Sequence, residues 1–220
     1  MEMKRSASKG GLVTCGIFLA CYVLFNFILV KLVHNHYYQI FVYIVLGIAG
    51  LIISKEELKE AGALWKKHPV RNALFLLGGL ILKIVIDNIA AIPYALLFPD
   101  YTSMNNSNLE TALQTLNPVL LITALGILGP IVEETVFRTI LTKRAGSFIP
   151  KAVAVIVSSL LFGVIHMHAL NLAELLSVLP QVLFGVLMAI LLLKTKNVTL
   201  VYIIHVLNNL LPLVMVILSR

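Results

Sequence analysis

Long apolar segments separated by short polar gaps organise the chain. Seven segments are candidates for helices that cross the hydrocarbon core of a bilayer, which takes about 20 apolar residues each. They cover residues 12–33, 37–53, 73–98, 118–141, 152–167, 175–193 and 198–218. The pattern predicts an all-α polytopic membrane helix bundle of about seven transmembrane helices. Because no long polar region intervenes, we expect residues 1–220 to form a single integral-membrane domain.

Lysine and arginine collect in alternate gaps between these segments. The basic gaps hold Lys4, Arg5 and Lys9, then Lys55, Lys59, Lys66, Lys67 and Arg71, then Lys143, Arg144 and Lys151, then Lys194 and Lys196. The other gaps and the C-terminus carry only Lys31 and Arg220. Basic residues close to the ends of spans stay on the cytoplasmic side. The alternation therefore predicts a cytoplasmic N-terminus and an external C-terminus.

Composition supports a membrane protein and argues against a nucleic-acid-binding protein. Of the 220 residues 60% are hydrophobic and 12% charged, with a mean hydropathy of +0.98, whereas soluble domains are about 25% charged. The net charge of +7 lies in the gaps and forms no basic face interleaved with aromatic residues. We therefore expect the lipid bilayer as a partner and no nucleic acid. We expect a multi-pass protein of a cell membrane. The small size, with no appended domain, suggests that this is a bacterial plasma membrane.

Two polar gaps are expected to contain helices of their own. In residues 55–67, Leu58, Ala61 and Trp65 recur at helical spacing with charged residues between them. This pattern is typical of an interfacial helix with its tryptophan at the depth of the lipid headgroups, although a solvated linker is the alternative. Residues 99–117 are predicted to form an external loop with a short helix from Leu109, capped by Asn108.

The third apolar segment contains an acid and a base at mid-depth. Lys83 and Asp87 are four residues apart, so on a helix they share one face and can neutralise each other. Charges inside a bilayer are costly and are functional candidates by default. A structural ion pair is one interpretation, and a coupling-ion or proton site of a small transporter is the other.

The fourth segment departs most clearly from its apolar surroundings, with Glu133, Glu134 and Arg138 in one short stretch. On a helix, Glu134 and Arg138 share a face, and Glu133 points about 100° away from them. We therefore predict that Arg138 holds Glu134 ionised and leaves Glu133 free for proton transfer. Pro130 is expected to bend the helix here and to free a backbone carbonyl.

Two later segments repeat a spacing of four residues. Phe162 and His166 lie in the fifth segment, and His205 and Asn209 lie in the seventh. A lone histidine on an apolar helix is usually structural, but three spans that each carry polar groups need partners in the bundle interior. The pattern predicts one shared polar site. Glu133 and His205 lie roughly 11–13 Å from the cytoplasmic ends of their segments, and His166 nearer 20 Å. The prediction therefore requires tilt, or a fifth helix that begins in the cytosol.

Glu133-Glu134-x-x-x-Arg138, Phe162-x-x-x-His166 and His205-x-x-x-Asn209, in this order on successive segments, resemble the three motifs of the CPBP family. This family comprises CAAX prenyl endopeptidases and bacteriocin-processing or immunity proteins, often described as intramembrane metalloproteases. The resemblance covers residues 118–213, which would form a catalytic core. It implies a helix bundle with a water-accessible cavity that cleaves peptide bonds.

The resemblance also implies a role for each motif residue. Glu133 would activate water with help from His166, and His205 with Asn209 would stabilise the oxyanion. A general base, a neighbouring imidazole and hydrogen-bond donors are the groups that amide hydrolysis needs.

The remaining motif residues would support this machinery. Glu134 and Arg138 would hold the end of the helix, and Phe162 is expected to contact the substrate.

Glu133, His166 and His205 could also supply the three protein ligands of a catalytic Zn²⁺ ion. The chain has no His-Glu-x-x-His motif, and a metal-free glutamate mechanism uses the same residues. We slightly favour the metal-free mechanism.

The sequence thus predicts an intramembrane endopeptidase that acts on a membrane-associated peptide or protein substrate, prenylated or of leader type. The alternatives are a non-enzymatic bacteriocin-immunity or scaffold protein with the same fold, and the small transporter. The sequence defines neither the substrate nor the oligomeric state.

Overall fold

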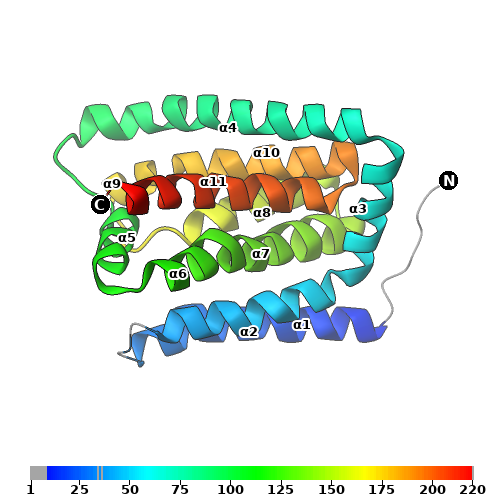
Figure 1. Cartoon of the computed structure of the whole chain (residues 1–220), viewed down its shortest axis with the longest axis horizontal. Coiled ribbons are helices and arrows are strands. Elements are labelled where there is room, and N and C mark those ends of the chain that lie inside the picture. The colour runs from blue at the N-terminus through cyan, green and yellow to red at the C-terminus, as the bar shows by residue number, and fades with distance from the viewer. Residues whose placement is uncertain (1–8, 34, 36, 220) are drawn as a thin grey trace.

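The computed structural model describes residues 9–33, 35 and 37–219, and these residues form helices and connecting turns without a β-strand. Figure 1 shows the long helices running side by side along one direction, with α3 and α5 running across the two ends. The topogenic residues Lys4, Arg5 and Arg220 lie outside the described residues.

The helices follow the predicted segments closely. In chain order they are α1 (Lys9–Val23), α2 (Tyr38–Ile53), α3 (Lys55–Lys67), α4 (Pro69–Leu97), α5 (Met104–Thr115), α6 (Pro118–Leu121), α7 (Gly129–Glu134), α8 (Lys151–Val164), α9 (Leu172–Ser177), α10 (Leu179–Thr195) and α11 (Val198–Leu218). Turns of π- or 3₁₀-helix extend α1 through Leu24–Ile28 and Leu29–Lys31. Similar turns occupy Ile122–Leu128, Thr135–Arg144 and Ala145–Ser147 around α7.

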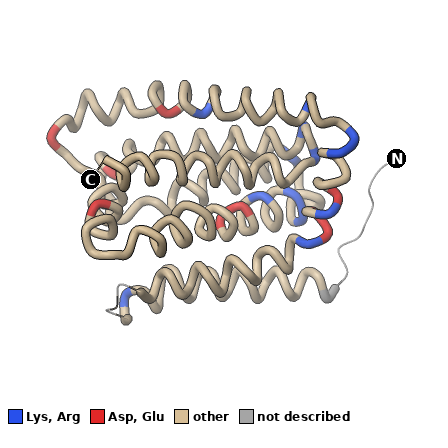
Figure 2. The backbone as a smooth tube through the Cα atoms, in the orientation of Figure 1, with Lys and Arg blue, Asp and Glu red and all other residues tan. Residues whose placement is uncertain are grey.

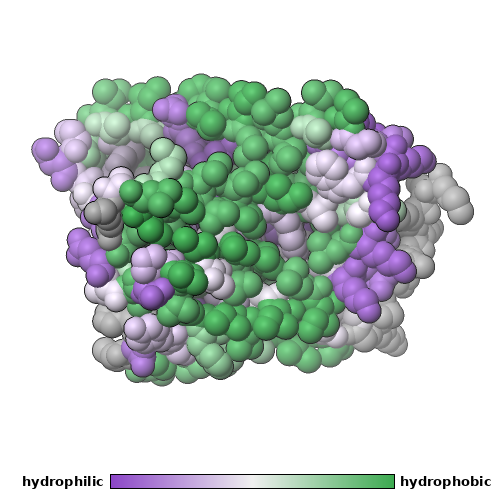
Figure 3. Space-filling model, in the orientation of Figure 1, coloured by the Kyte–Doolittle hydropathy of each residue, from purple (hydrophilic) through white to green (hydrophobic). Residues whose placement is uncertain are grey.

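Five of the helical stretches are long and apolar enough to span a membrane, and α2 with α3 counts as a sixth if this pair, bent by 66°, is one span. Helix α8 is apolar but has only 14 residues. All seven predicted segments are therefore helical, although by length the described residues contain five to six spans. The view in Figure 3 shows an apolar middle between two polar ends. The prediction of an all-α, multi-pass membrane protein is confirmed.

The segment Pro118–Ser147, which contains α7, lies at the centre of the bundle. In its most apolar window 56% of the residues are buried, against 11% in α4, which forms an outer layer in Figure 1. Helix α10 packs against both α8 and α4, and α11 packs against α7. The chain thus buries the stretch that carries Glu133, Glu134 and Arg138 inside a shell of apolar helices.

Glycines allow the closest of these helix contacts. A Cβ atom at Gly163 of α8 would lie 2.2 Å from Val182 Cγ2, and one at Gly185 of α10 would lie 3.0 Å from Ser159 Cα. Small residues let helices approach closely in lipid, where hydrophobic collapse supplies little drive for association.

Basic residues gather at one end of the bundle (Figure 2), as the positive-inside pattern predicts. Arg144 ties this end together, since its Nε and Nη2 donate to Glu57 at 2.9 Å each and its Nη2 donates to the carbonyl of Ile53 at 2.7 Å. Its Nη1 reaches Cys15 Sγ at 3.1 Å. This one side chain therefore links α1, the α2–α3 junction and the central segment. Which side of the membrane this end faces stays a prediction.

The amphipathic pattern of residues 55–67 does form a helix, α3. Its Trp65 Nε1 donates to Thr199 Oγ1 at 2.7 Å. The indole is thus fastened to the first turn of α11, a contact that the spacing in the sequence did not indicate.

The predicted start of the external helix at Leu109, with Asn108 as its cap, is wrong. Helix α5 begins at Met104, and Ser103 is the capping residue, with its Oγ accepting from Asn106 N. Glu174 of α9 accepts from Met104 N at 2.8 Å. The free N–H groups of a first helical turn need acceptors, and here a residue distant in the sequence supplies one of them.

Candidate active site

The central helix has irregular geometry on both sides of α7. Stretches of π-helix, Ile122–Leu128 and Thr135–Arg144, flank the six residues of α7. Pro130, in the first turn of α7, lacks an N–H and so cannot donate to a carbonyl of the preceding turn. Short π-helical stretches are frequent at functional sites. This segment therefore combines the predicted distortion with the predicted acids.

Glu134 lies between a cation and an imidazole. Its Oε2 is 3.3 Å from Arg138 Nε, and the side chains of both residues are 0% exposed. Its Oε1 is 2.8 Å from His205 Nδ1 of α11. The predicted pairing of Glu134 with Arg138 is confirmed. Because a carboxylate held by a guanidinium accepts hydrogen bonds, Nδ1 of His205 is the donor.

The same imidazole faces the second carboxylate. His205 Nε2 is 3.5 Å from Glu133 Oε2, and 12% of the Glu133 side chain is exposed. His205 therefore lies between the two adjacent acids and points a different ring nitrogen at each. The sequence suggested that the acids differ in role, and the structure places a single histidine between them.

Asn209 lies one turn beyond His205 on α11. Its Nδ2 donates to the carbonyl of Leu125 at 3.4 Å, and its Oδ1 accepts from Asn208 Nδ2 at 2.9 Å. These contacts orient the amide and leave one N–H of Nδ2 available to another acceptor.

The predicted segment 152–167 implied that His166 lies within a helix, and this is wrong. His166 lies beyond the end of α8. The last turn tightens, with His166 N donating to the carbonyl of Gly163 at 3.0 Å, so α8 ends at Val164. His166 Nδ1 is 2.8 Å from the carbonyl of Phe162. A carbonyl only accepts, so Nδ1 carries the proton of this bond, and in the neutral ring Nε2 is left as an acceptor.

The ring of Phe162 lies between the two imidazoles. Its centroid is 5.1 Å from that of His166 and 5.6 Å from that of His205. One aromatic ring therefore contacts both histidines, while a site shared by His166 and Glu133 stays a prediction. Phe162 is 1% exposed and contacts side chains of the protein itself, so its role with substrate stays a prediction.

The guanidinium of Arg138 is enclosed by aromatic rings. Its Cζ lies 4.8 Å from the centroid of Phe162 and 6.0 Å from that of Phe137. In the described part of the chain none of its three nitrogens has a hydrogen-bond acceptor of good geometry. The buried charge is thus balanced by the neighbouring Glu134 and by the faces of the rings.

Glu133, His166 and His205 do not meet as a metal-ligand set. Among the described residues, no three His, Cys, Asp or Glu side chains are grouped closely enough to hold a metal ion. As the side chains stand, this donor set does not fit a tetrahedral Zn²⁺ site with three protein ligands.

A hydroxyl cluster beside the acids was not predicted. Tyr202 Oη is 3.0 Å from Ser54 Oγ, 2.9 Å from Thr135 Oγ1 and 3.3 Å from Thr139 Oγ1, and all four side chains are buried. This hydroxyl cluster connects the α2–α3 junction to the central segment and to α11. Its Tyr202 lies one helical turn from His205. The sequence contained a signal, since Thr135 and Thr139 are four residues apart directly after Glu134.

The other intramembrane charges behave as an ion pair. Lys83 and Asp87 of α4 are in direct contact, as the sequence predicted. Lys83 Nζ lies 5.8 Å from the centroid of Phe184, whose ring is 5.1 Å from that of His205.

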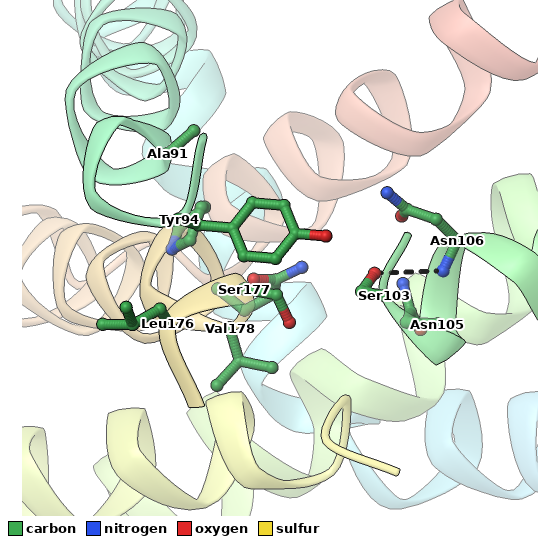
Figure 4. A pocket seen from close by; sticks show the side chains of 10 residues that line it. Ala91, Tyr94, Ser103, Asn105, Asn106, Leu176, Ser177 and Val178 are labelled. Atoms are coloured by element: carbon green, nitrogen blue, oxygen red, sulfur yellow. Dashed lines mark hydrogen bonds between the residues drawn. The ribbon is translucent and has the colours of Figure 1, made fainter. Parts of the chain in front are cut away.

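Two cavities of about 220 Å³ lie away from these residues. Figure 4 shows one of them, where Tyr94 and Ser177 face Ser103 and Asn106. The other is a groove between α4 and α10. None of the seven motif residues lines either cavity.

A multi-pass helix bundle that buries an acid–histidine cluster has the features of an intramembrane hydrolase. Comparison with protein families supports this class, because residues 115–211 match the family described as type II CAAX prenyl endopeptidase Rce1-like. The match covers slightly less than half of the chain, and it supports a CAAX-type intramembrane protease, a class of peptide hydrolase. All seven motif residues lie within the match. No curated protein and no solved structure matches the chain.

Proposed function

We propose that the protein hydrolyses a peptide bond of a membrane-associated substrate, lipid-modified or of leader type, with Glu133 as the general base. The observation that carries this proposal is the continuous chain of contacts from Arg138 through Glu134 and His205 to Glu133. It holds one imidazole in a fixed orientation beside a carboxylate that retains some exposure.

In this proposal Glu133 removes a proton from the attacking water. The water oxygen bonds to the carbonyl carbon of the substrate, and the proton passes to the leaving amine as the C–N bond breaks. Glu133 suits this role because Arg138 pairs with its neighbour Glu134, and the group that faces Glu133 is the imidazole of His205. General acid–base catalysis of this kind contributes about 10²–10⁴-fold.

His205 and Asn209 are the proposed donors to the oxyanion. In the imidazolium form both ring nitrogens donate, Nδ1 to Glu134 and Nε2 toward the site beside Glu133. Asn209 adds an amide N–H one turn away. Donors held in place before the reaction stabilise the tetrahedral intermediate without reorganising. Glu134 and Arg138 are then positioning residues, because they act through His205.

His166 is the proposed acceptor for the attacking water. Its Nδ1 is engaged with the carbonyl of Phe162, which presents Nε2 of the neutral ring as an acceptor. The proposed steps use only side chains of the protein, because the described donor set does not fit a metal ion.

The test compares purified wild-type protein with Glu133→Gln, which keeps the size of the side chain and removes its basicity. A panel of a farnesylated C-terminal peptide, the same peptide without its lipid, and a leader-type peptide in detergent micelles would define the substrate class. We expect cleavage of at least one peptide by the wild type and a loss of at least 10²-fold in the variant. Equal cleavage by both proteins would refute the role of Glu133.

Asp87→Asn is the matched control, since Asp87 is also an intramembrane acid but lies in α4, outside the proposed catalytic residues. The protease proposal predicts that it retains cleavage, whereas a transporter would depend on it. Cleavage that a chelator abolishes and added zinc restores would contradict the metal-free mechanism. A scaffold or immunity protein would cleave none of the peptides.

A further inference from the structure

A groove between α4 and α10 opens toward the surroundings of the bundle. It measures about 220 Å³, and its walls are apolar except for Lys194; Leu74, Phe75 and Gly78 line one side and Leu187 and Ile190 the other. Leu74 and Leu82, which mark its extent on α4, are eight residues apart, or about 12 Å along a helix. A space of this size accepts a hydrocarbon chain and excludes a helix, which is about 10 Å across.

Gly78 keeps the groove open. A Cβ atom built at this position meets no other atom within 4 Å, whereas one at the adjacent Gly79 would lie 2.7 Å from Ile204 Cδ1. The two glycines thus serve different purposes, because Gly79 allows α4 to approach α11 and Gly78 leaves space on the groove side.

Two cations stand at one end of this groove. Lys194 lines it near the end of α10, and Arg71 lies in the first turn of α4, three and four residues before Leu74 and Phe75 and so on the same helix face. Helix α4 begins, and α10 ends, at the end of the bundle where basic residues gather (Figure 2).

The side chains of Arg71 and Lys194 are both exposed. Within the described chain, neither side chain forms an ion pair or a hydrogen bond. Two neighbouring cations of the same end are instead paired, Lys143 with Glu60 and Arg144 with Glu57. An apolar groove with unpaired positive charge at one end matches a molecule that has a long apolar tail and an anionic head.

We propose that this groove binds an acyl chain of an anionic phospholipid, with the phosphate held by Arg71 and Lys194. Anionic lipids concentrate in the leaflet that faces the basic ends of membrane proteins. The chain would fill the space beside Gly78 and join α4, the least buried of the long spans, to α10. The proposal does not depend on catalysis, so Glu133→Gln should bind the lipid like the wild type.

The experiment measures lipid retention by native mass spectrometry and the apparent Tm in mild detergent, with phosphatidylglycerol or phosphatidylcholine added. Each basic residue near the headgroups favours anionic lipid by roughly fivefold, so we expect a preference for phosphatidylglycerol on the order of 25-fold. A rise of about 3–5 °C in apparent Tm should accompany saturation by this lipid alone.

Variants separate the headgroup from the chain. Arg71→Gln with Lys194→Gln should retain both lipids equally, and Lys151→Gln, an exposed cation of the same end outside the groove, should keep the wild-type preference. Gly78→Leu should abolish retention of either lipid, whereas Gly16→Leu, where a Cβ atom also meets open space, should not.

Equal retention of the two phospholipids by the wild type, or an unchanged preference in the double variant, would overturn the proposal. Displacement of phosphatidylglycerol by an equimolar farnesylated peptide would also overturn it, because the groove would then belong to the substrate. Lipid binding that survives in Glu133→Gln distinguishes this test from that of the protease mechanism.

Discussion

Replacing Glu134 by glutamine removes one buried charge while keeping the shape of the side chain. Glu134 and Arg138 are both 0% exposed, and Glu134 is the acid that contacts the guanidinium. The substitution leaves Arg138 buried without that counter-ion. Breaking a buried ion pair costs about 3–5 kcal/mol, and for a chain of this size we expect the apparent Tm to fall by about 10 °C.

The same substitution changes the partner of His205. The carboxylate oxygen that accepts from Nδ1 at 2.8 Å becomes a neutral amide, which can still accept but no longer stabilises a positive ring. We expect kcat to fall by about 10²–10⁴-fold at little change in KM, because the interaction develops in the transition state.

A second substitution separates the two effects. Glu134→Gln combined with Arg138→Met removes both charges, and replacing a buried pair by neutral groups of similar volume is often neutral or stabilising. The double variant should regain most of the lost stability and remain inactive. Thermal unfolding in detergent and peptide cleavage at saturating substrate measure the two quantities. Wild-type cleavage by Glu134→Gln would refute the positioning role, and a double variant as unstable as the single one would refute the electrostatic explanation.

Three further substitutions test the packing around the site, each by apparent Tm in detergent. Arg144→Met should lower stability by about 2–3 kcal/mol, because the largely buried carboxylate of Glu57 loses its charged donors. Lys143→Met, from a more exposed pair, should cost less than about 1 kcal/mol. Equal losses in the two variants would contradict this explanation. Gly185→Ala should cost about 1–3 kcal/mol through overpacking, and Gly16→Ala, in open space, should cost nothing. Tyr202→Phe should cost about 1–2 kcal/mol by removing the hydrogen bonds of its hydroxyl to buried Ser54 and Thr135, and an unchanged Tm would show that the cluster is not stabilising.

Periodicity and spacing in the sequence predicted much of the fold. Apolar segments of sufficient length must form helices in lipid, where each backbone group needs an internal partner, and all seven segments are helical in the structure. Spacing of four residues likewise predicted the pairs Glu134–Arg138 and Lys83–Asp87, because such residues share a helix face. These are local relations that a single helix determines.

The contacts between helices could not be predicted from spacing within the sequence. Nothing in the spacing indicated that His205 would lie between Glu133 and Glu134 with one ring nitrogen toward each, because the rotation of α11 against α7 depends on the packing of every helix around them. The start of α5 at Met104 depends in the same way on Glu174. The sequence by itself determined which residues are helical and which polar groups need partners. Only the tertiary structure decided which partner each obtained, because that choice is made across the interfaces where side chains of separate helices compete for the same space.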